Sequence, residues 1–359
     1  LRLADGQVLS ADGQNSLSFA ELLAGRQLEG EVTLPVALKP KGEYQWVGRP
    51  LPRVDVVPMI TGAPYYVHDL RFPEMVFARV VRPPGYGAGL ESYDESTVRQ
   101  TGDGILQIVR DGSFLAVIAE SEYQAIRAQQ RLRRHSRWSA PRQLPAGQPL
   151  KDYLKSIASR TEQVEQQGRF FGEPAKKLRA SYSKPYLMHG AMGPSCAVAR
   201  YESEALDLWT HSQGVYPLRR SLAAMLGMPE ERIHLKAVPG AGCYGHNGAD
   251  DVAAEAALLA RAMPGRHIHL QWSREEENAW EPYGSAMVME LEAGLDDEGR
   301  IDWWKYDLWS DTHSTRPGGD AAQLLPARYL AAPAALTSSG YLGGAYRNAP
   351  PYYAIAKRL

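Results

Sequence analysis

One glycine-rich loop constrains the fold of this chain more than any other feature of the sequence. The loop reads PGAGCYGHNGADD and lies between a predicted strand at 233–238 and a predicted Ala- and Leu-rich helix at 252–262. Glycines permit positive φ angles and close approach of a ligand, and the amides at a helix N-terminus attract anions. The order strand, glycine loop, helix therefore predicts an α/β unit with an anion-binding loop. Tight packing of the strand on the helix is the alternative interpretation.

The loop fits neither common nucleotide-binding fingerprint. Gly240, Gly242 and Gly245 keep the G-x-G-x-x-G spacing, but no clear carboxylate for a ribose follows, and the Gly-Lys-Ser/Thr ending of a P-loop is missing. Cys243 lies close to His246, which suggests a thiolate nucleophile with a base. Neighbours in one loop are rarely aligned for proton transfer, so we do not favour that hypothesis.

Gln213 is a second candidate ligand-binding residue. It lies between a predicted strand at 206–209 and a helix pattern that Gly227 ends. A glutamine at this place can aim a donor and an acceptor at a ligand without adding charge. The alternative is structural: Ser212 is the N-cap of the helix, and Gln213 is an ordinary residue of its first turn.

Arg347 is a third candidate. It follows the paired glycines at 343–344 and suits a carboxylate or an oxyanion, although a surface turn would also explain it. His267 and His269 alternate along a predicted strand and raise the question of zinc. No further His or Cys pair at helical spacing completes a tetrahedral set, so we do not predict a zinc site.

The composition excludes several classes of protein. The 359 residues carry 40 Lys plus Arg against 41 Asp plus Glu, a formal net charge of -1, which argues against a dedicated nucleic-acid binder. Two cysteines are too few for a disulfide scaffold or an iron-sulfur cluster held by four thiolates. No apolar run approaches the roughly 20 residues of a membrane helix, so we expect no membrane span. The compartment, cytoplasmic or periplasmic, is not encoded.

Changes in pattern along the chain predict its organisation. Strands at 105–109 and 114–119 flank a turn at Asp111 and Gly112, and a helix at 121–138 follows with Ser121 as its N-cap. The chain starts without Met and ends soon after Arg347, so we expect a fragment of a longer protein. The expected parts are a lead-in segment at 1–54, a domain at 55–140, a polar linker at 141–180 and a second domain at 181–359.

Three regions together resemble the xanthine dehydrogenase and aldehyde oxidase family, specifically its molybdopterin-binding large subunit of the nicotinate dehydrogenase and isoquinoline 1-oxidoreductase type. ITGAPYYVHDLRFPEMVFARVVRPP, with VRDGSFLAVIAE, is similar to the α/β hammerhead domain of that family. WTHSQGVYPLRRSLAAMLGMPEERI, followed by the glycine loop, is similar to the first half of its cofactor-binding domain. GGAYRNAPP is similar to the segment whose arginine approaches the metal. The fold class implied is α+β or α/β, with a hammerhead domain followed by part of a cofactor domain of mixed sheets and helices.

The resemblance gives the candidate residues their roles. Gln213 matches the glutamine that hydrogen-bonds an apical oxo ligand, Tyr244 and Gly245 match the aromatic-glycine pair whose backbone contacts the cofactor, and Arg347 matches the arginine beside the metal. Molybdenum is then held by the pterin dithiolene, in agreement with the low cysteine count, and no side chain is a metal ligand. The cofactor-binding residues implied are Gln213, Gly242, Cys243, Tyr244, Gly245 and Arg347.

The resemblance also implies a reaction and partners. The reaction is the oxidation of an N-heteroaromatic compound or an aldehyde with water as the oxygen source, on a molybdenum-molybdopterin cofactor in its cytosine dinucleotide form. The base is a glutamate expected beyond Leu359, so the fragment alone is expected to be inactive. Electrons would leave through a small subunit with [2Fe-2S] clusters to a cytochrome c or flavin acceptor. The rival hypothesis is a cofactor-free homologue that acts as a binding or assembly module.

The sequence also departs from the family pattern. The loop has Ala241 and Cys243 where more distant members are nearly all glycine, and His246 with Asn247 follow. The segment 188–194 lacks the glutamate of the motif that usually precedes the site. Substrate contacts therefore cannot be transferred from the family.

Overall fold

The computed structural model describes the chain except for residues 28, 32–33, 100–101, 103, 144, 158, 170–173, 313–314, 336–343 and 356. It consists of two compact units, Leu1–Val56 and Val57–Leu359. The first unit is a small antiparallel sheet of β1 (Arg2–Ala4), β2 (Gln7–Leu9) and β3 (Ser16–Ser18), followed by α1 (Phe19–Leu23). Ser18 is the N-cap of α1, because its side chain accepts from the amide of Glu21.

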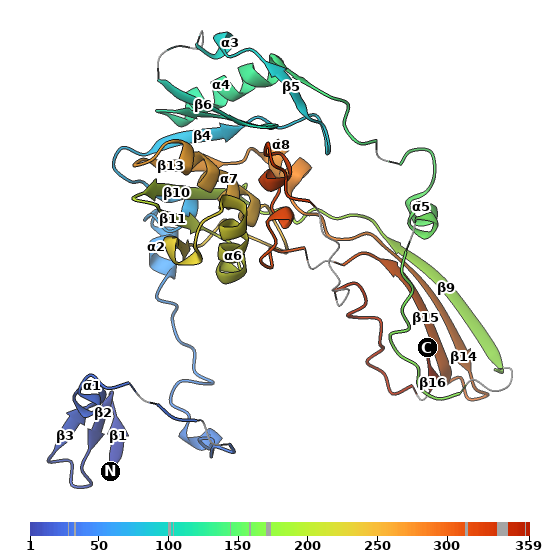
Figure 1. Cartoon of the computed structure of the whole chain (residues 1–359). Helices are drawn as coiled ribbons and strands as arrows, with labels where there is room; N and C mark the ends of the chain where they lie inside the picture. The colour runs from blue at the N-terminus through green and yellow to red at the C-terminus, as the bar shows by residue number, and fades with distance from the viewer. Residues whose placement is uncertain are drawn as a thin grey trace. The chain divides into compact units, whose positions relative to one another are not determined.

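A seven-stranded mixed sheet is the centre of the second unit (Figure 1). Its two parallel pairs are β11 with β12 and β13 with β4, and the other neighbours are antiparallel. The strands in sheet order are β12 (Ile233–Ala237), β11 (Ala205–Thr210), β10 (Cys196–Glu202), β13 (His267–Gln271), β4 (Val76–Val80), β7 (Phe114–Ala119) and β6 (Ile105–Asp111).

Helices cover both faces of this sheet. The strand β7 is buried along its whole length, and its alternate side chains enter two separate cores. Phe114 and Ile118 join the core that contains α6 (Val215–Leu226) and α7 (Ala249–Ala262), whereas Leu115 joins the core on the other face, under α4 (Glu122–Arg134). The mixture of sheets and helices that the sequence predicts is confirmed.

The rest of the second unit contains a four-stranded sheet and short elements. The sheet order is β16 (Lys357–Arg358), β15 (Ile301–Ser310), β14 (Met287–Leu295) and β9 (Lys176–Lys184), and β5 (Leu90–Tyr93) pairs with β8 (Ser136–Trp138). The short helices are α2 (Val56–Ile60), α3 (Ser96–Arg99), α5 (Leu150–Ser156) and α8 (Arg274–Trp280). The single-turn 3-10 helices of this unit are Val67–Asp69, Glu230–Arg232, Ala321–Gln323 and Pro326–Arg328, and another, Lys41–Glu43, belongs to the first unit. Among the described residues, no helix has the length and apolar character needed to cross a bilayer.

Two local predictions are wrong. The helix that starts after Ser121 ends at Arg134 and not at Trp138, because Ser136–Trp138 pairs with β5 as the strand β8. The N-cap of α6 is Gly214, without a side-chain cap, and not Ser212, whose oxygen accepts from the Gly214 amide at 3.1 Å while its hydroxyl donates to the carboxylate of Asp250. The predicted end of α6 is correct, since Gly227 is the left-handed C-cap at φ 62°.

Candidate functional site

Two parallel strands bring Gln213 and the glycine loop to one edge of the seven-stranded sheet. The strands β11 and β12 are neighbours, with Thr210 opposite Ala237 at their carboxyl ends. Parallel neighbours end at the same edge of a sheet, and ligands of α/β proteins bind at such edges. The segment after β11 contains Gln213, and the segment after β12 is the glycine loop, residues 239–248. Residues far apart in the sequence therefore meet here.

The backbone of the loop adopts conformations that favour glycine. The φ angles of Gly242 and Gly245 are +97° and +141°, and Tyr244, which is not a glycine, has a φ of +55°. A Cβ atom on Gly245 would lie 2.0 Å from Cδ2 of His189, so no side chain fits at this position. Positive φ at a non-glycine residue concentrates at binding sites, where the surrounding structure compensates its strain.

The loop presents a row of amides without partners. Within the described part of the chain, the backbone N–H groups of residues 243–247 make no hydrogen bond. The next amides are satisfied, because Gly248 donates to the Glu277 carboxylate at 3.3 Å and Ala249 donates to Asn247 Oδ1 at 3.3 Å. Free amides beside the N-terminus of α7 are donors that suit an anionic group.

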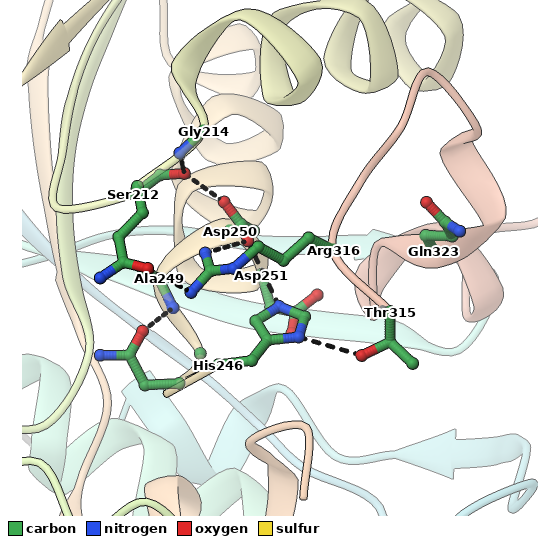
Figure 2. Close-up of polar contacts among 12 residues, drawn as sticks. Ser212, Gly214, His246, Ala249, Asp250, Asp251, Thr315, Arg316 and Gln323 are labelled. Carbon is green, nitrogen blue, oxygen red and sulfur yellow. Dashed lines mark hydrogen bonds and ion pairs between the residues drawn. The ribbon is translucent and has the colours of Figure 1, made fainter. Parts of the chain in front are cut away.

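Asp250, in the first turn of α7, organises the side chains next to the loop (Figure 2). Its Oδ1 accepts a hydrogen bond from the Ser212 hydroxyl, and its Oδ2 lies 3.4 Å from His246 Nε2 and 3.5 Å from Arg316 Nη1. The other ring nitrogen of His246, Nδ1, is 3.0 Å from the hydroxyl of Thr315. The carboxylate is buried at the positive end of a helix dipole, which stabilises its negative charge.

Arg316 joins Gln213 to the loop. Its Nη2 donates to Gln213 Oε1 at 2.9 Å and to the carbonyl oxygen of Gly245 at 3.1 Å. Gln213 is exposed, and its Nε2 has no partner within the described residues. The Gln213 side chain therefore presents a hydrogen-bond donor, its Nε2, at the surface of the protein.

A buried carboxyl group lies behind the loop. The amide of His189 donates to Glu281 Oε1 at 2.5 Å, and His189 Nδ1 lies 3.6 Å from the same oxygen. Burial raises the pKa of Glu281 to about 7 and lowers the pKa of His189. Four buried polar atoms here have no hydrogen-bond partner among the described residues: His189 Nδ1, Glu281 Oε2, Asp250 Oδ2 and Arg316 Nη1. Such orphaned groups concentrate where a ligand completes the network.

Arg347 is not brought into contact with the other candidates. Its side chain is exposed, no hydrogen bond or ion pair joins it to Gln213 or the glycine loop in the described part of the chain, and Gly343 lies outside the described residues. Its neighbours Ala345 and Tyr346 line a cavity of about 860 Å³. Thr315 lines the same cavity, which therefore reaches the cluster around Asp250.

The remaining candidates have local structural roles. The thiol of Cys243 donates to the Gly245 carbonyl at 2.7 Å, whereas His246 contacts Asp250 and Thr315, so thiol and imidazole are not aligned with each other. His269 is buried and lies 3.5 Å from the Cys196 sulfur, and burial raises the pKa of that thiol. No group of three or more His, Cys, Asp or Glu side chains among the described residues could hold a metal ion.

Sequence patterns did not single out Asp250, Thr315, Arg316, His189 or Glu281 as site residues. Asp250 belongs to the acidic first turn of a helix, and His189 to a short motif, so each had only a local interpretation. Arg316 follows β15 in a segment without periodicity, and no pattern linked it to a loop about 70 residues earlier in the chain. Only the tertiary structure assembles this half of the site.

Comparison with known proteins places this site in a family. Residues 156–331 match the family described as molybdopterin cofactor-binding domain. One subunit of the nicotinate dehydrogenase of Pseudomonas putida is 36% identical over 312 residues, which cover 84% of this chain and 26% of that protein. The beta subunit of isoquinoline 1-oxidoreductase of Brevundimonas diminuta is 25% identical over 308 residues, covering 81% of this chain and 39% of that protein.

Solved structures agree at the level of the fold. The aldehyde oxidoreductase from Desulfovibrio gigas aligns with a TM-score of 0.59 at 18% identity, over 73% of this chain and 34% of that one. Quinoline 2-oxidoreductase from Pseudomonas putida 86 aligns with a TM-score of 0.56 at 20% identity, over 72% of this chain and 38% of that one.

The chain therefore contains a molybdopterin cofactor-binding domain. The resemblance to the molybdopterin-binding large subunits of the xanthine dehydrogenase and aldehyde oxidase family, which the sequence motifs predicted, is confirmed at the level of this domain. It spans 26% and 39% of the lengths of the two curated relatives named above.

Proposed function

We propose that this chain forms the cofactor-binding part of a molybdenum hydroxylase large subunit. The whole protein would oxidise an N-heteroaromatic compound or an aldehyde with water as the oxygen source. The observation that carries the proposal is the row of free amides at 243–247, which lies at the same sheet edge as Gln213. The family match and the names of the relatives support the same chemistry.

The residues at this edge fit a molybdopterin cofactor. The cofactor is anionic, and the loop offers unpaired amides, a helix N-terminus and a backbone without a Cβ at Gly245. Gly242, Cys243, Tyr244 and Gly245 would hold it through the backbone, and the exposed Nε2 of Gln213 would donate to an oxo group. When bound, the cofactor supplies the redox chemistry, and the protein supplies orientation and electrostatics.

We propose that Arg347 donates hydrogen bonds to a substrate or to the cofactor. Arginine forms charge-assisted hydrogen bonds with oxyanions and carboxylates through a planar fork of donors. The Arg347 side chain is exposed, and its neighbour Tyr346 lines the cavity that Thr315 connects to the cluster around Asp250. A substrate or the cofactor itself could therefore engage it.

The cavity supports an aromatic substrate. Its volume of about 860 Å³ is in the range of small-molecule sites, and aromatic side chains of β15 form part of its wall, among them Trp304 and Trp309. Flat aromatic walls favour planar ligands through offset stacking. Two relatives are named for nicotinate and isoquinoline, which are N-heteroaromatic compounds.

The proposal extends to domains and partners. We assign residues 1–54 to a lead-in segment, 55–140 to an α/β hammerhead domain, 141–180 to a linker and 181–359 to the N-terminal half of the cofactor domain. The cofactor would be the cytosine dinucleotide form, and a small subunit with [2Fe-2S] clusters would carry electrons to a cytochrome c or a flavin. These features follow from the family resemblance.

The test is metal and pterin analysis of the full-length protein copurified with its small subunit. The proposal predicts about one molybdenum and one pterin per large subunit. A folded complex that contains neither would refute it and would favour the cofactor-free binding module. Gln213→Ala is expected to lower turnover while molybdenum content stays near normal, and unchanged turnover would remove Gln213 from the site.

A further inference from the structure

We propose that Arg316 is a positioning residue that fixes which end of the Gln213 side-chain amide faces the cofactor. This inference rests on the proposed function, because it concerns the residue that would meet the oxo group. Arg316 Nη2 donates to Gln213 Oε1 at 2.9 Å. The acceptor end of the amide is thereby engaged, and the NH2 end is left to donate.

The opposite amide orientation would be unfavourable. A 180° flip of the Gln213 side-chain amide would place its NH2 group against the guanidinium of Arg316, and both groups are donors. The hydrogen bond to a charged partner would be lost, and the NH2 would point at a positive charge. Arg316 therefore selects the orientation in which Gln213 meets an anionic oxo group with a donor.

Arg316 can select this orientation because its own position is fixed. Its Nη1 lies 3.5 Å from Oδ2 of Asp250, whose carboxylate is only 4% exposed. Asp250 is in turn held by the hydroxyl of Ser212 and lies 3.4 Å from His246 Nε2 (Figure 2). A buried carboxylate in the first turn of α7 thus anchors the guanidinium, so the rotamer freedom of Arg316 is already lost when the protein folds and is not lost again when the cofactor binds.

The same nitrogen links Gln213 to the loop. Besides Gln213 Oε1, Arg316 Nη2 donates to the carbonyl oxygen of Gly245 at 3.1 Å. Gly245 has a φ of +141°, and a Cβ atom on this residue would meet the imidazole of His189. One side chain from the segment after β15 therefore ties together the two segments that follow β11 and β12. A lysine could keep the charge beside Asp250 but could not reproduce the planar fork.

A double-mutant cycle in the full-length complex tests the proposal. The variants are Gln213→Ala, Arg316→Met and the double variant, with Arg328→Met as a matched control. Arg328 lies in the same stretch of the chain, and its Nε donates to the Ala322 carbonyl at 2.9 Å. Molybdenum and pterin content, kcat/KM and the electron paramagnetic resonance spectrum of the partly reduced metal are measured for each.

The expected outcome is strong non-additivity. Arg316→Met should lower kcat/KM by about 10- to 100-fold, the range for loss of a hydrogen bond to a charged group, and should shift the metal spectrum. In the Gln213→Ala background the same change should add less than about threefold, because Arg316 then has no amide to orient. Arg328→Met should match the wild type. Losses at Arg316 and Gln213 that multiply would overturn the proposal.

Gln213→Glu separates orientation from folding, since Arg316 stays in place in this variant. A carboxylate keeps the acceptor for Arg316 but lacks the NH2 donor, so turnover should fall as far as in Gln213→Ala, with normal cofactor content. Retained turnover would show that the oxygen of Gln213 faces the cofactor and would also overturn the proposal. A wild-type complex without molybdenum and pterin would refute the proposed function first, an outcome distinct from either of these.

Discussion

Replacing Gly245 by alanine should destabilise the protein and weaken cofactor retention. Two separate effects add at this position. The φ of +141° is strained for any L-residue, at about 1–3 kcal/mol. A Cβ would also lie 2.0 Å from Cδ2 of His189, and overpacking of this kind costs about 1–3 kcal/mol. The backbone amide of His189 is held by Glu281, so relief of the clash requires the imidazole to leave its place or the loop to shift. We therefore expect a loss of about 2–6 kcal/mol in the free energy of unfolding.

Two further variants separate these effects. Gly190 has a φ of +65° but no atom within 4 Å of the position of a Cβ, so Gly190→Ala reports backbone strain alone. Gly245→Ala combined with His189→Ala removes the clash and should recover part of the loss. Urea unfolding followed by circular dichroism measures all four proteins. If Gly245→Ala costs no more than Gly190→Ala, the loop is not pressed against His189 and the reasoning fails.

Three other predictions concern Glu281, the ion pair of Glu255 with Arg82, and the thiol of Cys243. Burial raises the folded-state pKa of Glu281 to about 7, above its ordinary value of 4.5. The folded state therefore binds this proton more tightly than the unfolded state does, so the free energy of unfolding should fall as pH rises from about 5 to about 8. Glu281→Gln should flatten that part of the curve of unfolding free energy against pH, and identical curves for this variant and the wild type would contradict the raised pKa. Asp251 makes a separate contribution of the same sign, which Asp251→Asn removes. Glu255→Ala should cost about 3–5 kcal/mol in thermal or urea unfolding, because it removes the closer of the two carboxylates beside the buried Arg82 and leaves only Glu276, at 3.9 Å. Arg82→Met in the same chain should recover much of the loss, and additive losses would argue against the pair. Cys243→Ser should leave turnover of the full-length protein nearly unchanged, because the thiol only donates to the Gly245 carbonyl, and a large loss in a steady-state assay would make the thiol a participant.

Elements whose signals are local could be predicted from the sequence. The strand at 114–119 has the predicted bounds, because a short apolar run after an Asp-Gly turn has few alternatives. The helix ends at Ser121 and Gly227 are also where their capping residues placed them. The end of α4 could not be predicted, because Ser136–Trp138 takes its conformation from pairing with Leu90–Tyr93, and such a contact leaves no trace in the local pattern.

Some features of the site could likewise be predicted from local sequence signals, and others depend on the tertiary fold. Turn and helix signals beside Gln213 and the glycine loop are local, so the sequence could indicate each of them separately. Their meeting depends on the parallel pairing of β11 with β12, which the spacing of the two segments does not encode. An equally local pattern indicated Arg347, yet within the described residues no hydrogen bond or ion pair joins it to the loop.

The charged residues of the site, Asp250 and Arg316, determine how well it can discriminate between anions. A free-amide loop attracts anions of many kinds, and positive φ angles alone do not distinguish a cofactor from a sulfate ion. Discrimination needs side chains held in one orientation, and here a chain of contacts from the buried Asp250 through Arg316 to Gln213 does this. Each link is a hydrogen bond or close ion pair between residues of different elements, so its strength depends on the tertiary fold and not on the motif. A homologue that kept the glycine loop but lost Asp250 or Arg316 should therefore still bind anions at the loop, yet orient the Gln213 amide poorly.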